Sequence, residues 1–380
     1  MQSFLYLKKG SPVMKRLLAK TLSAILAAAM LLTGCASDDS SSAKDETSSV
    51  AESTSDSSEN SSTEETSSED ESSDKDSSAD SSVPDEKTSS ITPLMWEVTS
   101  SKGNKIIFMG SMHALKSEVY PLPQIITDAY KNSDILAVEC DISVSTNDLG
   151  TQLSQIDKMF YSDGSTIEDH IGTEMYNNIC AFAEKCGANI SLYNRCKPWV
   201  FVTLLESFTM NASELNTNHG IDLYLLNKAH EDGKEICEIE SAEFQLNLIT
   251  GLSDEICKEL LAGYTEANYE LVIKNLVDTY NAWCSGDLQF FSNSVDLDAS
   301  VKAAADAGVP MSEESVKLLK EYNKELIFDR NIGMADKAAE LLESGKNVFY
   351  VVGEAHFPGD KGILKLLEDK GYTVTQIMPK

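Results

Sequence analysis

The sequence predicts an α/β protein: a mixed, largely parallel sheet with helices on both faces and a mostly helical middle segment. Three uninterrupted apolar runs, at residues 106–109, 135–138 and 348–352, are rich in Val, Ile, Leu, Phe and Tyr. Such runs are typical of strands that are buried on both faces, as in parallel sheets. Residues 253–344 show only helical patterns. Strands at both ends of the folded part, around a helical middle, imply that its two ends pair in one sheet.

Residues 1–35 are predicted to be a lipoprotein signal peptide. A basic stretch at residues 14–20 precedes an apolar run at residues 21–32, which is too short to span a bilayer comfortably. The segment ends in the tetrapeptide Leu-Thr-Gly-Cys, which resembles a bacterial lipobox, so we expect Cys35 to become the lipid attachment site after cleavage before it. The protein would then be anchored by lipid to the extracytoplasmic face of the cell membrane. The alternative is an ordinary cleaved signal peptide with a stray cysteine.

Residues 36–90 are predicted to be a disordered, acidic, Ser-rich linker. They hold 17 acidic residues, 3 lysines and few apolar side chains, so they cannot bury enough surface to offset the entropy of ordering. Of the formal charge of −30, this linker carries −14 and residues 91–380 carry −21, against +5 in residues 1–35. Residues 91–380 have the composition of a globular domain, and such an acidic domain without a basic stripe excludes nucleic acid as a partner.

The folded part is predicted to begin with a β-hairpin. Its strands, residues 96–98 and 105–109, enclose a short turn that contains glycine. A short helix ending near residue 130 follows. The next strand, residues 135–138, ends on Glu139.

Residues 150–230 are predicted to be mostly helical, with one candidate strand at residues 190–193. A helix introduced by the sequence Asn-His-Gly-Ile-Asp covers residues 218–231. A strand at residues 235–239 then finishes on Glu240.

The C-terminal part is predicted to hold helices up to about residue 344 and then two strands. Ser253 is a suitable N-cap because acidic residues follow it in the first turn. After the strand at 348–352, a helix at residues 362–370 stops at Gly371, and the last strand covers residues 372–378.

One motif, Gly-x-x-His, occurs directly after two of the apolar strands, ending at His113 and at His356. Ligands of open α/β sheets bind beyond the carboxyl ends of the strands. If these strands are parallel neighbours, both histidines and Glu139 converge at one edge. Two imidazoles and a carboxylate suit a divalent metal such as Mn, Co, Zn or Fe, which can activate a bound water. Each histidine alone is better explained as a structural hydrogen-bonder, and the repetition is what favours a shared site.

Several motifs follow one another in a distinctive order. They are Gly110-Ser111-Met112-His113, Tyr120-Pro121-Leu122-Pro123, Glu139, Gly220-Ile221-Asp222 with Ala229, Glu240-Ser241-Ala242-Glu243-Phe244-Gln245, Arg330-Asn331 and Gly353-Glu354-Ala355-His356. In this order they resemble the TraB/GumN family, which is related to the Tiki metalloproteases and more distantly to erythromycin-esterase-like and ChaN-like proteins. The resemblance covers essentially all of residues 91–380 and implies an EreA/ChaN-like fold.

The resemblance implies a metal centre made by His113, Glu139 and His356, with Mn, Co or Zn as the metal. Arg330 would be a nearby catalytic contact, able to hold a carboxylate or a substrate carbonyl. The implied activity is metal-dependent hydrolysis of a peptide or protein substrate. The chain departs from the family at Ser111, where Thr is common, and in the Phe-Pro-Gly turn that follows the second histidine. The alternative is a non-catalytic lipoprotein that binds a peptide signal, a metal or haem at the same edge.

Three more acids are candidates for roles at the site. Glu354 would act as general base for a metal-bound water, or its side chain points to solvent. Glu240 ends a strand and would contact substrate, or it serves as an N-cap or a structural hydrogen-bonder. Asp222 lies in the first turn of a helix, where an acid is favoured in any case.

Seven cysteines remain besides Cys35, with no C-x-x-C pair and no zinc-finger spacing. Cys180 and Cys186 are near enough in sequence to pair in an oxidising compartment. The alternative is that the seven are mostly free, buried thiols.

Overall fold

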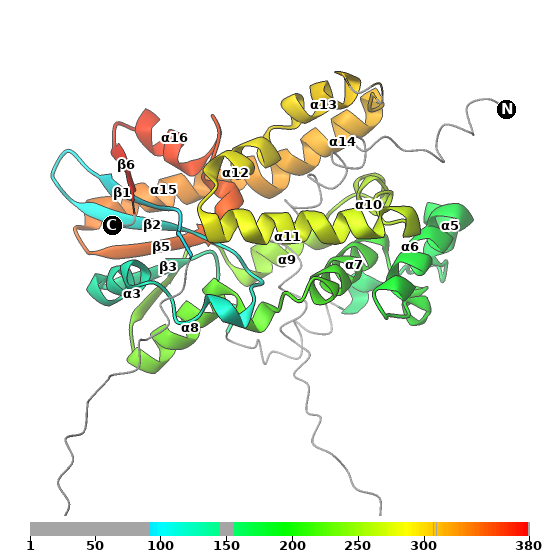
Figure 1. Ribbon diagram of the computed structural model, residues 1–380, viewed down its shortest axis with the longest axis horizontal. Helices are drawn as coiled ribbons and strands as arrows, with labels where there is room; N and C mark the ends of the chain where they lie inside the picture. The colour runs from blue at the N-terminus through cyan, green and yellow to red at the C-terminus, as the bar shows by residue number, and fades with distance from the viewer. Residues whose placement is uncertain (1–90, 144–155, 307, 309, 379–380) are drawn as a thin grey trace, which may run out of the picture. The chain divides into compact units, whose positions relative to one another are not determined.

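The sheet has six strands in the computed structural model, which describes residues 91–143, 156–306, 308 and 310–378 (Figure 1). Their order across the sheet is β4-β3-β5-β2-β1-β6. The bounds are Met95–Thr99 for β1, Lys105–Ser111 for β2, Ile135–Val138 for β3, Glu235–Glu238 for β4, Val348–Gly353 for β5 and Thr373–Ile377 for β6.

The strand directions confirm the predicted mixed, largely parallel sheet. Strands β4, β3, β5 and β2 run parallel, whereas β1 is antiparallel to both β2 and β6. Every residue of β5 is buried, as its uninterrupted apolar sequence predicts. The pairing of β1 with β6 joins the two ends of the domain, also as predicted.

The two strands that precede the Gly-x-x-His motifs are neighbours. Strands β2 and β5 pair in parallel, with Ser111 opposite Gly353 at their carboxyl ends. Strand β3 lies on the other side of β5, with Val138 opposite Val351. The three strand ends that lead to His113, Glu139 and His356 are therefore adjacent at one edge of the sheet.

Helices cover both faces of the sheet, with α3 and α8 on one side and α16 on the other in Figure 1. The helices of the described residues are α3 (Gln124–Asn132), α5 (Ile167–Ile171), α6 (Thr173–Lys185), α7 (Pro198–Ala212), α8 (Ile221–Asp232), α9 (Ala242–Thr250), α10 (Asp254–Leu261), α11 (Tyr269–Ser285), α12 (Leu288–Val295), α13 (Leu297–Asp306), α14 (Glu313–Asn323), α15 (Asp329–Ser344) and α16 (Ile363–Asp369). A π-helical turn, Lys324–Phe328, joins α14 to α15.

Two hydrophobic cores result from this arrangement. One forms around the sheet and includes Phe108, Trp283 and Tyr350. The other forms among the middle helices and includes Phe201 and Tyr322. The predicted helical middle segment therefore builds a core of its own beside the sheet.

The predicted strand at residues 190–193 is wrong, because this segment is a 3₁₀ turn, Ser191–Tyr193. The Asn189 side chain accepts hydrogen bonds from both the amide and the hydroxyl of Ser191, at 2.9 and 2.7 Å. This local Asx turn competes with extended backbone.

All seven cysteines of the described residues are free, and three of them are buried. Cys180 and Cys186 do not pair, in agreement with the free-thiol alternative, but four of the seven thiols are only partly buried. The predicted signal peptide with Cys35 and the acidic linker, residues 1–35 and 36–90, lie outside the described residues. Within the described part, no helix is both long and apolar enough to cross a membrane.

A buried acid in the second core predicts how stability depends on pH. Glu206 on α7 is 3 % exposed, and neither of its carboxyl oxygens has a hydrogen-bond partner. Burial raises the pKa of Glu206 well above its usual value, so the folded state keeps a proton that the unfolded state releases. Above the unfolded-state pKa, stability therefore falls as the pH rises.

We expect Glu206→Gln to weaken this fall and to be more stable than the wild type at pH 8. Urea unfolding of both proteins at pH 5 and pH 8 measures the difference. Glu243→Gln, which changes an exposed acid on α9, is the matched control and should keep the wild-type pH dependence. If Glu206→Gln showed the same pH dependence of stability as the wild type, the Glu206 carboxyl would be ionised in the folded protein.

Candidate functional site

Both motif histidines lie at the same point of the sheet edge. A Cβ placed on Gly353 would lie 3.6 Å from His113 Nε2 and 3.6 Å from His356 Cδ2. The two ring atoms are therefore no farther apart than twice this distance. The same point is 3.2 Å from Glu139 Oε1, so a side chain at Gly353 would fill the space between the three groups.

His113 is held by Asp222, which lies in the first turn of α8. The ring Nδ1 contacts Asp222 Oδ2 at 2.8 Å. Burial lowers the pKa of His113, but the charge of Asp222 and the hydrogen bond outweigh it and raise the pKa to about 9. The other ring nitrogen, Nε2, is buried and has no hydrogen-bond partner.

His356 is held by an amide. Its Nδ1 lies 2.6 Å from Asn331 Oδ1, and the Asn331 Nδ2 donates to the carbonyl oxygen of Lys361 at 2.8 Å. Because an amide oxygen only accepts, His356 carries its proton on Nδ1, and its buried Nε2 presents an unpartnered lone pair. Burial and the charge of Arg330 lower the pKa of His356 to about 3.

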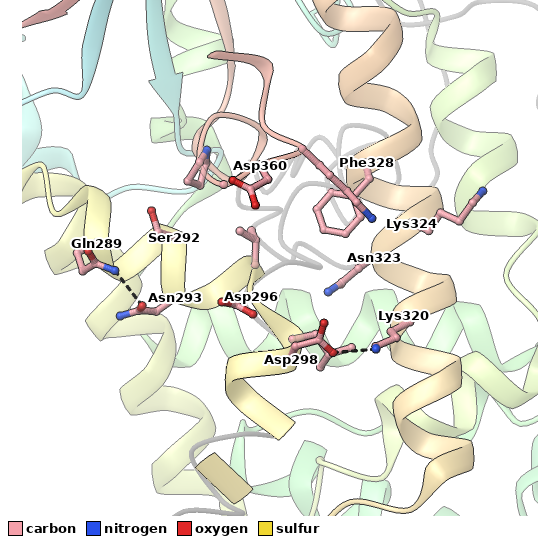
Figure 2. A pocket seen from close by; sticks show the side chains of 15 residues that line it. Gln289, Ser292, Asn293, Asp296, Asp298, Lys320, Asn323, Lys324, Phe328 and Asp360 are labelled. Carbon is pink, nitrogen blue, oxygen red and sulfur yellow. Dashed lines mark hydrogen bonds and ion pairs between the residues drawn. The ribbon is translucent and has the colours of Figure 1, made fainter. Parts of the chain in front are cut away.

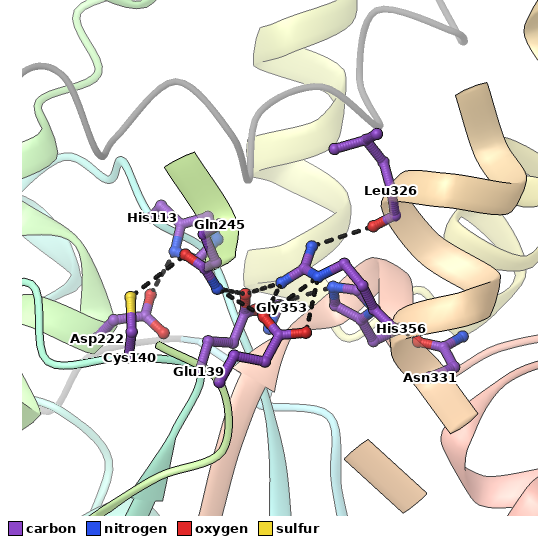
Figure 3. A network of polar contacts seen from close by, with 11 residues as sticks. His113, Glu139, Cys140, Asp222, Gln245, Leu326, Asn331, Gly353 and His356 are labelled. Carbon is purple, nitrogen blue, oxygen red and sulfur yellow. Dashed lines mark hydrogen bonds and ion pairs between the residues drawn. The ribbon is translucent and has the colours of Figure 1, made fainter. Parts of the chain in front are cut away.

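Glu139 stays ionised between the two rings. Its Oε1 accepts the backbone N–H of Gly353 at 2.8 Å, and its Oε2 accepts from Arg330 at 2.5 Å and from Gln245 at 3.0 Å. Burial alone would raise the pKa of Glu139, but Arg330, the two histidines and the Gly353 amide hold it well below its usual value. Figure 3 shows Glu139 between His113 with Asp222 and His356 with Asn331.

Arg330 and Glu240 form the frame of the site. The Arg330 guanidinium donates to Glu240 from Nε at 3.0 Å and from Nη2 at 2.8 Å, and Nη1 donates to the Leu326 carbonyl at 3.0 Å. Arg330 thus holds two carboxylates of the protein itself. The structure gives Glu240 the structural hydrogen-bonding role rather than an open position facing substrate.

Gln245 links the same two carboxylates. Its Nε2 donates to Glu139 at 3.0 Å and to Glu240 at 2.9 Å, and its Oε1 accepts from the Cys140 thiol at 3.2 Å. Since the thiol is the donor in this contact, Cys140 fixes which end of the amide faces the acids.

The structure does not bring Glu354 to the imidazoles. A Cβ on Gly110 would lie 1.4 Å from Glu354 Oε2, so the carboxyl packs against that glycine. Because consecutive strand residues face opposite sides and Ser111 pairs with Gly353, Gly110 faces away from the histidines. Glu354 is buried, and burial alone raises its pKa. The predicted general-base role therefore has no geometric support, and the solvent-exposed alternative is wrong.

Sequence reasoning missed three of the side chains that shape the site: Asn331, Gln245 and Cys140. Asn331 directly follows Arg330, and Gln245 ends the motif that begins at Glu240, so both lay within recognised motifs without an assigned role. Only their distant partners in the fold reveal what they do.

The loop after His356 also borders a cleft. Pro358, Asp360 and Lys361 line one wall, opposite residues of α12, α13, α14 and the π-helical turn (Figure 2). Its volume is about 610 Å³, which is within the range of ligand pockets. The Asn331 side chain hydrogen-bonds both to the Lys361 carbonyl of this loop and to the His356 ring. One amide therefore connects the wall of the cleft to the histidine.

The donor chemistry of the site fits a divalent cation. Two buried imidazole nitrogens lack partners, and the second nitrogen of each ring is fixed by Asp222 or Asn331, the arrangement that metal-binding histidines require. Two carboxylates, Glu139 and Glu240, pair with the Arg330 guanidinium, and a third, Asp222, pairs with His113. Among the described residues, no three His, Cys, Asp or Glu side chains are grouped closely enough to hold a metal by themselves.

Comparison with curated proteins finds several distant relatives. YbaP of Escherichia coli (strain K12), itself uncharacterized, is 27 % identical over 147 residues, which are 39 % of this chain and 52 % of YbaP. Metalloprotease TIKI2 of Danio rerio is 24 % identical over 203 residues, 50 % of this chain and 38 % of TIKI2. Metalloprotease TIKI1 of Xenopus tropicalis is 21 % identical over 329 residues, 76 % of this chain and 62 % of TIKI1.

The chain thus spans about half the length of the first of these relatives. No solved structure matches it. The TraB/PrgY/gumN family model matches residues 94–376, from just before β1 to the last strand. The match includes both Gly-x-x-His motifs and every residue of the polar network, and the chain therefore belongs to the TraB/PrgY/gumN family.

Proposed function

We propose that this protein is a metal-dependent hydrolase that cleaves peptide bonds. His113 and His356 would hold a divalent metal, Mn, Co or Zn, through their Nε2 atoms. Glu139 Oε1 would join as the third ligand after a shift of these side chains, which the structure does not group closely enough for a metal. The observation that carries this proposal is the pair of buried, unpartnered imidazole nitrogens on either side of Glu139: His113 Nε2 lies 3.6 Å from the position of a Cβ on Gly353, and His356 Nε2 lies 3.9 Å from Glu139 Oε1. The names of the Tiki relatives support a metalloprotease activity.

A bound metal would supply a Lewis acid and an activated water. The remaining steps rest on the chain's own side chains. Asp222 and Asn331 fix Nδ1 of each ring, which leaves Nε2 as the ring atom that would bind the metal, and His113 would give up its Nε2 proton on binding. Arg330 keeps Glu139 ionised, so Glu139 would serve as a metal ligand rather than as a proton donor. The cleft beside the loop after His356 is a suitable place for the substrate chain.

The test compares metal content and peptide hydrolysis of the wild type with those of His113→Ala/His356→Ala. We expect about one metal per wild-type chain and none in the variant, and hydrolysis of a peptide library only by the wild type. His170→Ala is the matched control, since His170 stacks on Tyr161 at 3.7 Å in the helical segment. Circular dichroism checks that all three proteins are folded.

Equal metal binding by the wild type and the double variant would contradict the proposal. Metal binding without hydrolysis would instead favour a binding protein for a peptide signal, a metal or haem. The position of Glu354 on the opposite face supports this second candidate, because it leaves the imidazoles without an evident general base.

We also propose that Cys35 carries the lipid that anchors the protein to the extracytoplasmic face of the cell membrane. The basic stretch, the apolar run and the Leu-Thr-Gly-Cys tetrapeptide of residues 1–35 support this proposal. Cys35→Ser should move the protein from the membrane fraction to the soluble fraction. A variant that stays membrane-bound would contradict the lipid anchor.

A further inference from the structure

Ser111 is a buried residue at the edge of the proposed metal site whose hydroxyl has no hydrogen-bond partner. It is 3 % exposed, and its Oγ contacts no donor or acceptor of the protein. A buried polar group left unpaired costs about 1–3 kcal/mol. The protein thus keeps a destabilising hydroxyl at the end of β2.

The strand register places this hydroxyl on the same face as the imidazoles. Ser111 pairs with Gly353, and register partners in a parallel pair point to the same side of the sheet. That side of Gly353 is where His113 Nε2, His356 Cδ2 and Glu139 Oε1 converge. The Ser111 side chain therefore forms part of the wall around that point.

The other unpartnered buried groups of the described residues lie elsewhere. Glu354 packs against Gly110 on the opposite face, Glu206 lies on α7, Asn275 lies on α11, and Tyr322 belongs to the helical core. Ser111 Oγ shares the face of the two histidine rings. Three unpartnered polar atoms, two imidazole nitrogens and one hydroxyl, therefore lie at this edge of the sheet.

We propose that Ser111 is a catalytic residue whose hydroxyl donates a hydrogen bond to the carbonyl oxygen of the peptide bond under attack. This role rests on the proposed hydrolase function. Negative charge develops on that oxygen in the transition state, so a preorganised donor stabilises the transition state more than the bound substrate. Ser111 forms no covalent bond in this scheme, since no base contacts its hydroxyl.

Ser111→Ala should lower kcat of the metal-loaded enzyme by about 10²–10³, and Ser111→Thr should restore most of it. The metal content of both variants should equal that of the wild type. Thermal unfolding separates this role from a structural one. Removing an unsatisfied hydroxyl should keep or raise Tm, whereas a structural serine would lower it. The matched control is Ser133→Ala, whose buried hydroxyl donates to the Tyr130 carbonyl at 2.7 Å; it should lose stability and keep full activity.

A second readout does not require turnover. Acetohydroxamate, which carries a carbonyl oxygen, is titrated into the Co²⁺-loaded full-length protein and followed by visible absorption. Its Kd should rise about tenfold or more in Ser111→Ala, the loss of one charge-assisted hydrogen bond. Equal Kd and equal kcat in the wild type and Ser111→Ala would overturn the role of Ser111 and would leave the proposed function standing. A wild type that takes up no Co²⁺ would overturn the proposed function, and the role of Ser111 with it.

Discussion

Replacing Arg330 with methionine is expected to lower the free energy of unfolding by about 3–5 kcal/mol, the usual cost of removing one partner from a buried ion pair. Its side chain is only 5 % exposed, and the carboxylates that it contacts, Glu139 and Glu240, are 7 % and 9 % exposed. Without the guanidinium, the two buried carboxylates would have no cation between them, and the Gln245 amide would be the donor that they share. Urea unfolding at neutral pH measures the loss.

Two controls show whether the unpaired charges cause this loss. Lys324→Met removes an exposed cation that pairs with Asp329 at 2.5 Å, and it should change stability by about 0.5 kcal/mol or less. Adding Glu139→Gln and Glu240→Gln to Arg330→Met should recover part of the loss, because the facing charges are removed. A loss below about 1 kcal/mol in Arg330→Met would contradict the buried-charge account.

Replacing Gly220 with alanine is expected to weaken both the fold and the metal site. The added Cβ would lie 2.1 Å from the carbonyl oxygen of His113 and 3.1 Å from that of Thr217. Both are backbone atoms, so the N-terminus of α8 must move away from the loop that carries His113. We expect a stability loss of about 1–3 kcal/mol from overpacking. Metal affinity should fall about 10–100-fold as Asp222 loses its hold on the ring.

Gly333→Ala is the matched control for this prediction. Gly333 lies within α15, is exposed, and an added Cβ would meet no atom within 4 Å. Alanine is the better helix former there, so this variant should be about 0.5–1 kcal/mol more stable and keep its metal affinity. Chemical unfolding and metal titration measure both quantities for the two variants. If Gly220→Ala matched the wild type in both, close backbone contact would not be what positions His113.

Local sequence patterns predicted the strands and the sheet they form. Uninterrupted apolar runs identified β2, β3 and β5, because a strand that is buried on both faces needs apolar side chains at every position. The repeated Gly-x-x-His motif placed both histidines just beyond strand ends. The one wrong strand, at residues 190–193, failed because the Asn189 side chain closes a turn that hydrophobic pattern alone does not report.

The sequence by itself thus determined which strands form the sheet and which side chains reach its edge, since both follow from short-range periodicity. The tertiary structure decided what each side chain does there. His113 meets Asp222 across 109 positions of sequence, and His356 meets Asn331 across 25. Glu354, the predicted general base, packs against Gly110 on the opposite face, and the strand register turns Ser111 to the face of the imidazoles. Hydrogen-bond partners and strand faces depend on the packing of distant segments, and no local pattern encodes them.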